Sequence, residues 1–174
     1  MGDVITCRCS GCSYNKNISL GSGFNFPKIY SDTVNKMKNG VYGNEAQSFF
    51  LDNPYGAIDC EYTAARCSGC GELKSVMALT MYVPKDVKKV KRLRRKKRGF
   101  WSFAYPGRDD DYVDVKAYDT KDLYAEYGKY KHTCSSCGSP LELLPDFRNR
   151  ILRGDIKCPK CGSYLVLENN TCWD

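Results

Sequence analysis

The stretch HTCSSCGSPLELLPDFRNRILRGDIKCPKCGSYLVL, residues 132–167, contains two C-x-x-C pairs with 20 residues between them. Each pair is followed directly by a glycine, Gly138 in the first case and Gly162 in the second. A C-x-x-C turn places two thiolates on one side of a tight knuckle, and backbone N–H groups of that knuckle point toward the sulfur atoms. The glycine eases the turn because it adopts a positive φ without steric cost. The pattern predicts a metal site with four cysteine ligands.

The same spacing occurs twice in the first half of the chain, as CSGC at residues 9–12 and as CSGCG at residues 67–71. Their near identity indicates an internal repeat, opened by the 54 residues between Cys12 and Cys67. We therefore expect two metal sites, one formed by the two earlier pairs and one formed by the two later pairs. The eight predicted ligands are Cys9, Cys12, Cys67, Cys70, Cys134, Cys137, Cys158 and Cys161.

The number of cysteines, 11 in 174 residues, is odd and well above ordinary usage. The chain begins MGDVITCRCSGC, without a cationic segment that leads into an apolar run, and no stretch approaches the roughly 18 consecutive apolar residues of a membrane span. We therefore expect a cytoplasmic protein, and structural disulfides are rare in that reducing compartment. Metal ligation is favoured over cross-linking, and the predicted cofactor is Zn²⁺, two ions per chain.

The four knuckles CSGC, CSGCG, CSSCG and CPKCG, with their flanking strands, resemble the zinc ribbon superfamily with rubredoxin-like knuckles. The resemblance implies a small α+β fold with two zinc ribbons built of antiparallel β-hairpins. Ser13 is a departure, because it stands where the other three knuckles have glycine. Members of the superfamily serve as nucleic-acid-binding modules, as protein adaptors and as structural parts of enzymes, so the resemblance leaves the function open.

The predicted organisation has three parts. Residues 1–83 are expected to form the first ribbon, with a helical insertion at about residues 27–53, and residues 128–174 are expected to form the second ribbon. Residues 84–127 are a basic and aromatic segment that connects them. Neither ribbon can bury much apolar surface alone, so we expect metal binding to decide whether the ribbons fold.

The insertion contains start and stop signals for two helices. Pro27 and Gly40 bracket the first helix, which we expect over about residues 28–39. Asn44 is the expected cap of the second helix, and Pro54 follows its end.

Three cysteines and the single histidine lie outside the C-x-x-C pairs. Cys7 is an alternative to Cys9 as a ligand, because a C-x4-C spacing is also geometrically feasible. Cys60 and Cys172 are expected to be buried apolar thiols, with completion of an irregular site as the alternative. His132 lies outside any H-x-E pattern and is assigned no role. Because open catalytic zinc sites usually include histidine or carboxylate ligands, the sequence indicates a protein that is not an enzyme.

Positive charge is concentrated in KDVKKVKRLRRKKR, residues 85–98, which has ten basic residues and one acidic residue. The chain carries +7 overall, so the remainder carries −2. Val87, Val90 and Leu93 recur at a helical interval, although an exposed strand or an irregular loop fits the segment equally well. Like charges four residues apart repel in such a helix, so we expect an anionic partner to order it.

Three functional hypotheses follow. The first is a non-enzymatic protein that binds DNA or RNA through phosphate contacts and base stacking. The second is an adaptor whose ribbons or basic segment dock an acidic protein partner. The third is a redox-sensing zinc switch, because CRC beside a C-x-x-C pair resembles zinc sites that release metal on oxidation. The predicted nucleic-acid contacts are Lys88, Lys89, Lys91, Arg92, Arg94, Arg95, Lys96, Lys97, Arg98 and Trp101.

Overall fold

The fold was obtained as a computed structural model that describes residues 2–22, 26–94, 113–117 and 120–173, with the backbone alone at residues 26–27 and 169–173. The chain divides into two compact units. Unit 1 consists of Met1–Phe24, Glu61–Ala78 and Lys131–Asp174, and unit 2 consists of Asn25–Cys60 and Leu79–Tyr130. The described elements are helices and antiparallel sheets, which confirms the predicted small α+β class.

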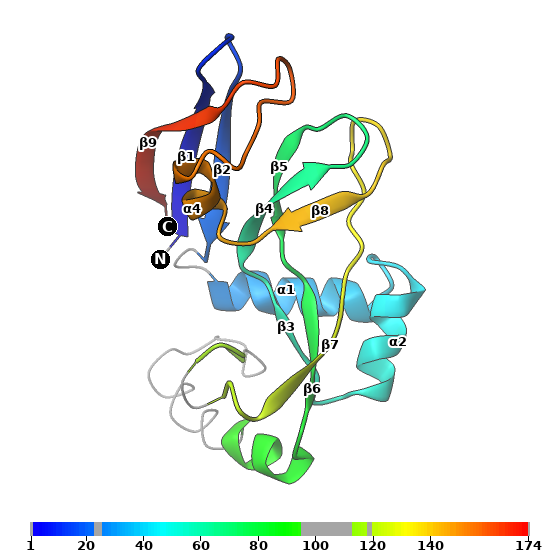
Figure 1. The fold of residues 1–174 in the computed structure, drawn as a ribbon. Coiled ribbons are helices and arrows are strands. Elements are labelled where there is room, and N and C mark those ends of the chain that lie inside the picture. Colours follow the sequence, from blue (N-terminus) through cyan, green and yellow to red (C-terminus); the bar gives the residue numbers. More distant parts are fainter. Residues whose placement is uncertain (1, 23–25, 95–112, 118–119, 174) are drawn as a thin grey trace. The chain divides into compact units, whose positions relative to one another are not determined.

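Unit 1 is built on a sheet with strand order β5-β4-β2-β1-β9, and β8 also pairs with β4 (Figure 1). A short helix, α4, precedes β9 in the chain. The elements of unit 1 are β1 (Gly2–Cys9), β2 (Asn15–Gly21), β4 (Tyr62–Cys67), β5 (Leu73–Met77), β8 (Leu141–Leu144), α4 (Phe147–Leu152) and β9 (Leu165–Trp173).

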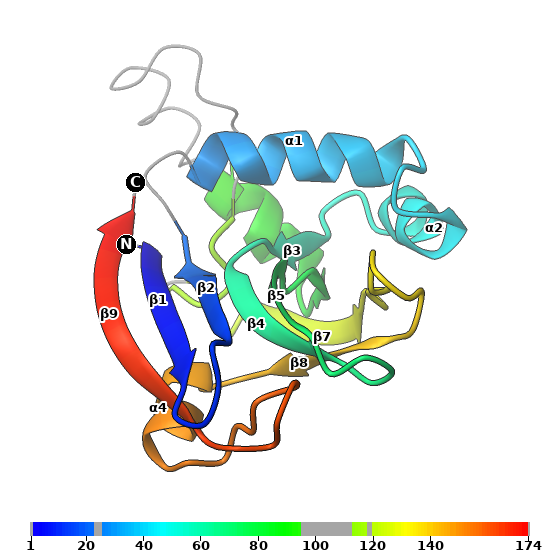
Figure 2. The ribbon, with the colours of Figure 1, turned by 90° about the horizontal axis from the view of Figure 1, so that it is seen from above.

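Two similar arrangements of three strands make up unit 1, and we call them module A and module B. In module A, β1 and β2 form a hairpin and β9 runs beside β1, so that Cys9 lies opposite Leu165 (Figure 2). In module B, β4 and β5 form a hairpin and β8 pairs with β4, so that Cys67 lies opposite Leu141. In both modules the third strand comes from the C-terminal part of the chain and runs antiparallel to the first strand of the hairpin.

The two modules share one apolar core. They join where Gly21 of β2 pairs with Tyr62 of β4, and the N–H of Ser19 donates to Ser75 Oγ at 2.8 Å. Buried side chains of both modules and of α4 pack together beneath this junction. They include Ile5, Ile18, Ala64, Leu73, Leu144, Phe147, Ile151, Ile156 and Leu165.

Unit 2 contains the helical insertion. The elements are α1 (Phe26–Lys38), α2 (Asn44–Asp52), β3 (Ala57–Asp59), β6 (Thr80–Pro84) and β7 (Tyr124–Lys129), and residues 87–94 are also helical. The strands form a sheet of order β3-β6-β7. Both predicted helices of the insertion are therefore present. Gly40 follows the first with a φ of 77°, as its stop signal requires, whereas Gly43 rather than Asn44 caps the second.

The core of unit 2 is mainly aliphatic and aromatic. Its fully buried side chains include Tyr30, Met37, Phe49, Ile58 and Met81. Phe49 makes ring contacts with Phe50 and Tyr127, with centroid distances of 4.9 and 5.1 Å. A second buried cluster contains Ala57, Val90, Val113, Val115 and Tyr124.

The boundaries between the units differ from those expected at residues 83 and 128. Within residues 72–83, β5 belongs to unit 1 and β6 to unit 2, with Leu79 between them at a φ of 47°. The pairing of β3 with β6 and the pairing of β4 with β5 follow the same register, since Asp59 pairs with Thr80 and Tyr62 pairs with Met77. The segment expected to connect two ribbons supplies β7 to the sheet of unit 2.

Candidate metal centres

The eight cysteines predicted as ligands gather in two clusters, one in each module. Within a cluster, the sulfur atoms all lie within 4.8 Å of one another. Module A holds Cys9, Cys12, Cys158 and Cys161, and module B holds Cys67, Cys70, Cys134 and Cys137. These clusters, with their C-x-x-C spacing, agree with the resemblance to zinc ribbons.

The predicted partnership of the knuckles is wrong. The first knuckle of the chain faces the fourth, and the second faces the third. The physical reason is strand pairing: β9, which follows the fourth knuckle, pairs with β1, and β8, which follows the third knuckle, pairs with β4. Each site therefore combines a knuckle at the tip of a hairpin with a knuckle from the C-terminal part of the chain.

The sulfur spacings suit a tetrahedral cation. Four sulfurs at about 2.3 Å from a central Zn²⁺ lie about 3.8 Å from one another, whereas a disulfide requires about 2.05 Å. The distances are 3.4 Å for Cys9–Cys161, 3.7 Å for Cys12–Cys158, 3.3 Å for Cys67–Cys137 and 3.9 Å for Cys70–Cys134. Both donor sets thus fit a four-coordinate metal ion.

Backbone hydrogen bonds close all four knuckles in the same way. The N–H of the first cysteine donates to the carbonyl oxygen five residues later, at 2.9 Å for Cys9 and Cys67, 2.8 Å for Cys134 and 2.7 Å for Cys158. In three knuckles the glycine after the second cysteine has a φ of 72 to 75°, and its N–H returns to the first cysteine's carbonyl oxygen. Ser13 lacks the positive φ, so the knuckle of Cys9 and Cys12 is the irregular one, as predicted.

Facing knuckles are held by a matched set of contacts. In module A the N–H and Oγ of Ser10 both donate to the carbonyl oxygen of Tyr164, each at 3.1 Å. In module B the N–H and Oγ of Ser68 donate to the carbonyl oxygen of Pro140, at 3.0 and 3.1 Å. The serine of each C-S-G-C sequence therefore ties its knuckle to the opposite one.

The glycine of each C-S-G-C sequence has a steric role. A Cβ built on Gly11 would lie 3.0 Å from Ser163 Cβ, and a Cβ built on Gly69 would lie 2.9 Å from Ser139 Cβ, with the serine hydroxyl oxygens closer still. Real Cβ atoms do not approach this closely, so only glycine lets the knuckles meet. Sequence reasoning did not identify these four residues, although the shared C-S-G-C and C-G-S sequences carried the signal.

N–H groups within the knuckles point toward sulfur, as predicted. Gly11 N lies 3.3 Å from Cys9 Sγ, Cys70 N lies 3.4 Å from Cys67 Sγ, and Lys160 N lies 3.4 Å from Cys158 Sγ. Such bonds offset the negative charge of a thiolate.

The pKa values of the cysteines differ within each cluster, and the same pattern of differences is found in both modules. The hydroxyl and the backbone N–H of Ser139 lower the pKa of Cys137 to about 6, and those of Ser163 lower the pKa of Cys161 to about 6. The Glu72 backbone lowers the pKa of Cys70, but hydrogen bonding among the thiols and burial outweigh it and raise the pKa to about 11. Cys137 and Cys161, whose pKa values are lowered to about 6, thus occupy equivalent positions in the two modules, and a bound cation would favour the thiolate form of all four ligands.

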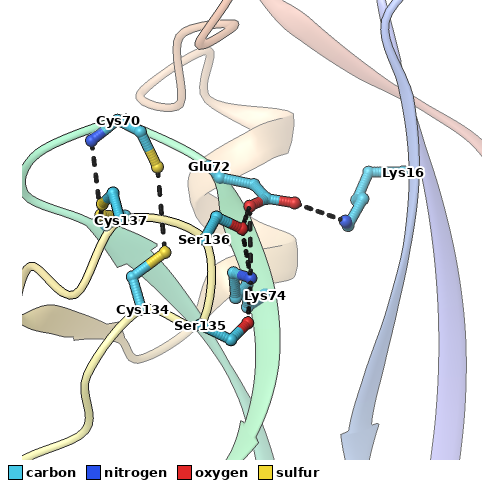
Figure 3. A network of polar contacts seen from close by, with 9 residues as sticks. Lys16, Cys70, Glu72, Lys74, Cys134, Ser135, Ser136 and Cys137 are labelled. Carbon is cyan, nitrogen blue, oxygen red and sulfur yellow. Dashed lines mark hydrogen bonds and ion pairs between the residues drawn. The ribbon is translucent and has the colours of Figure 1, made fainter.

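A network of charged and hydroxyl groups lies beside the cluster of module B (Figure 3). Glu72 Oε1 accepts from Lys16 Nζ at 3.1 Å, and Glu72 Oε2 accepts from Ser136 Oγ at 2.9 Å and pairs with Lys74 Nζ at 3.2 Å. Lys74 Nζ also donates to Ser135 Oγ at 2.8 Å. The hydrogen bonds from Lys16, Ser136 and Lys74 lower the pKa of Glu72 to about 2, which keeps this carboxylate charged.

Of the cysteines whose side chains are described, Cys7 and Cys60 lie outside both clusters, as does His132. Cys9 rather than Cys7 belongs to the cluster of module A. Cys7 is fully buried in the core of unit 1, and burial raises its pKa to about 12. Cys60 is fully buried in unit 2, as expected for an apolar thiol. The side chain of Cys172 is outside the described residues. Burial also lowers the pKa of His132, for which no role had been assigned.

The first part of the basic segment is a capped and anchored helix. Lys89 N donates to Asp86 Oδ1 at 3.0 Å, so the one acidic residue of the segment caps residues 87–94. Val90 is fully buried. The guanidinium of Arg94 donates to the carbonyl oxygens of Tyr55 and Gly56, at 3.0 and 2.9 Å. The burial of Val90 and the bonds of Arg94 hold this helix within unit 2.

The structure separates the predicted nucleic-acid contacts into three groups. Lys88, Lys89, Lys91 and Arg92 are exposed on the helix. Arg94 is engaged within unit 2. Arg95, Lys96, Lys97, Arg98 and Trp101 lie outside the described residues.

In the described parts of the chain, no helix combines the length and apolar character that a membrane span requires. No known protein family, curated protein sequence or solved structure gives a significant match to this chain. The resemblance to zinc ribbons therefore rests on the geometry of the cysteine clusters, and no family is assigned.

Proposed function

We propose that the chain is a non-enzymatic protein with two structural Zn²⁺ ions, one in each module, and that it binds nucleic acid through the exposed basic face of helix 87–94. The first part rests on the two sets of four converging sulfurs, with adjacent contacts of 3.3 to 3.9 Å. Four thiolates complete a tetrahedral zinc site and leave no open position for a substrate, which is the pattern of structural sites. Bound zinc would supply folding energy to unit 1.

Metal analysis of the purified protein tests this part. Native mass spectrometry is expected to find two zinc ions per chain, because there are two complete donor sets. Tetrahedral S₄ sites also accept iron, so the same sample should be examined for iron and for visible thiolate-to-iron absorption. Protein isolated under reducing conditions with disulfides and no metal would overturn the proposal.

The nucleic-acid part rests on how helix 87–94 displays its charge. Val90 and Arg94 face into unit 2, whereas four cations separated by one to four positions are exposed. At 100° per residue, Lys88, Lys89, Lys91 and Arg92 fall on one continuous face. A fixed set of cations can contact neighbouring phosphates without first ordering the backbone, and counterion release then favours binding.

The matching experiment measures affinity for labelled duplex and single-stranded DNA and RNA across a salt series. The test variant carries Lys88→Gln, Lys89→Gln, Lys91→Gln and Arg92→Gln. We expect the slope of log K against log salt to fall by about 3 to 4, because each lost phosphate contact removes about 0.7 to 0.9. The control variant has the same charge loss at other exposed positions: Lys28→Gln, Lys36→Gln, Lys131→Gln and Arg148→Gln.

The control is expected to keep the slope of the wild type. If both variants bind as the wild type does, the helix is not the contact surface. If the wild type fails to bind any of the four probes near physiological salt, nucleic-acid binding is refuted, and the exposed cations point to an acidic protein partner instead.

A further inference from the structure

Modules A and B can be compared position by position, because their knuckles carry the same hydrogen bonds. The bond from Cys9 N to Tyr14 O corresponds to the bond from Cys67 N to Glu72 O. Tyr14 is therefore the counterpart of Glu72, and by the same spacing Lys16 is the counterpart of Lys74. In the facing knuckles, Pro159 and Lys160 are the counterparts of Ser135 and Ser136.

The comparison shows an ionic tie that module B has at these positions and module A lacks. Glu72 and Lys74 lie on the hairpin side of module B, and Ser135 and Ser136 belong to the facing knuckle (Figure 3). The bonds from Ser136 to Glu72 and from Lys74 to both serines, at 2.9, 2.8 and 3.1 Å, join the two halves of the cluster directly. Lys74 is 19% exposed and Glu72 31%, while Ser135 and Ser136 lie at the surface, so only the hairpin side of the network is shielded from water.

The corresponding positions of module A carry different chemistry. Tyr14 is buried in the apolar core and has no carboxylate to offer. Pro159 lacks a side-chain hydroxyl, and Lys160 has an ammonium group in place of one. Lys16 Nζ donates to Glu72 Oε1 at 3.1 Å. Lys16 and its counterpart Lys74 therefore both bind the carboxylate of module B. Ser13, in place of glycine, further leaves module A with the less regular knuckle.

We propose that Glu72 is the positioning residue of the metal site in module B, and that it makes this site release its metal after the site in module A. The inference rests on the proposed binding of zinc. Release of a metal ion requires the facing knuckles to separate, and the Glu72 network opposes that separation in one module. Groups that orient metal ligands from outside the ligand set typically change metal affinity by 10- to 100-fold.

The test is a chelator challenge of the zinc-loaded protein, sampled by pulsed alkylation of the freed thiols. Mass spectrometry of the peptides reports the two sites separately, through Cys12 and Cys161 in module A and Cys70 and Cys137 in module B. In the wild type we expect the module A thiols to become reactive about ten times sooner. In the Glu72→Gln variant the two rates should come within about twofold, because module B accelerates and module A does not.

Glu142→Gln is the matched control. Glu142 is an exposed carboxylate on β8 of the same module, outside the network, and the variant removes the same charge. It should keep the wild-type order of release. Ser136→Ala leaves the net charge unchanged and, like Glu72→Gln, should reduce the difference in release rate between the two modules. This variant replaces Glu72→Gln in the test if the latter fails to fold.

The outcomes separate the two proposals. Equal release from both sites of the wild type, or an equal effect of Glu72→Gln and Glu142→Gln, would overturn the positioning role while leaving zinc binding intact. Protein that holds no metal before the chelator is added would refute the proposed function itself.

Discussion

Unit 1 carries two clusters of four sulfur atoms in its knuckles beside an apolar core, whereas the core of unit 2 includes aromatic rings. Unit 1 contains all eight clustered cysteines, and unit 2 contains only Cys60, buried among apolar groups. The knuckles of unit 1 are glycine-containing turns beside its strands. In unit 2, Tyr30 and Met37 of α1 and Phe49 of α2 are fully buried. We therefore expect the stability of unit 1 to depend on bound metal more than the stability of unit 2 does.

Removal of metal is expected to have the largest effect on the difference in stability between unit 1 and unit 2. A structural zinc ion in a small module contributes about 10 to 16 kcal/mol of apparent binding energy, against about 5 to 15 kcal/mol for the net stability of a domain. Chelation should therefore abolish amide-exchange protection in β1, β4, β8 and β9, while α1, α2 and β6 keep a larger share. Hydrogen exchange with mass spectrometry checks this, with zinc-saturated chelator as the control. Equal loss of protection in both units would contradict the comparison.

The reverse experiment targets the core of unit 2. Phe49 is 1% exposed, so Phe49→Ala should cost about 3 to 5 kcal/mol and lower protection mainly in unit 2. Leu51→Ala on the same helix is the control, since Leu51 is 74% exposed and should change stability by less than about 0.5 kcal/mol. Both variants should retain two zinc ions. Loss of metal from Phe49→Ala would show that the units are not independent in stability.

Much of the architecture could be predicted from local sequence signals. Pro27 and Gly40 bracketed a real helix, and C-x-x-C spacing identified all eight clustered cysteines. The partnership of knuckles could not be obtained from proximity in the chain, because strand pairing joins residues 74 to 80 positions apart in module B and 156 to 171 positions apart in module A. Knuckles with the same sequence proved to be equivalent parts of different sites. Partners instead have complementary sequences, C-S-G-C opposite C-x-x-C-G-S.

The basic segment shows the other limit of local reasoning. In the sequence, Arg94 is one of ten basic residues in the segment. In the structure, its guanidinium donates to the carbonyl oxygens of Tyr55 and Gly56, about 40 positions earlier. Only tertiary structure reveals these acceptors. Repulsion between like charges is visible in the sequence, whereas the burial of Val90 and the bonds of Arg94, which hold residues 87–94 within unit 2, are not. The expectation that an anionic partner orders the segment stays a prediction.

A smaller change tests the complementarity of facing knuckles in unit 1. Gly69→Ala places a methyl group against Ser139, and overpacking of this kind typically costs about 1 to 3 kcal/mol. Thermal unfolding of the zinc-loaded protein measures the loss. Adding Ser139→Gly should recover most of the stability by removing the opposing Cβ and hydroxyl. Gly11→Ala should cost a similar amount, because Ser163 occupies the matching position in module A. A double variant no more stable than Gly69→Ala would contradict the steric explanation.

The smallest effect is expected at the start of helix 87–94 in unit 2. Asp86→Ala removes the acceptor for Lys89 N, which should increase amide exchange at the first turn of this helix by about fivefold. Asp86→Asn keeps a side-chain oxygen and should restore most of the protection. Neither variant should alter metal content, because Asp86 lies in the unit without clustered cysteines.

The acid dependence of the cap distinguishes it from simple charge removal. Hydrogen bonds from the backbone N–H groups of Lys89 and Lys88 lower the pKa of Asp86 below its ordinary value. A lowered pKa in the folded state means that the stabilisation is complete above the ordinary aspartate pKa and is lost as the pH falls through the lowered value. Protection of the first turn should therefore fade on acidification in the wild type and stay flat in Asp86→Asn. Exchange rates corrected for intrinsic pH effects would show this, and parallel curves for the two proteins would mean that the carboxylate does not act as the cap.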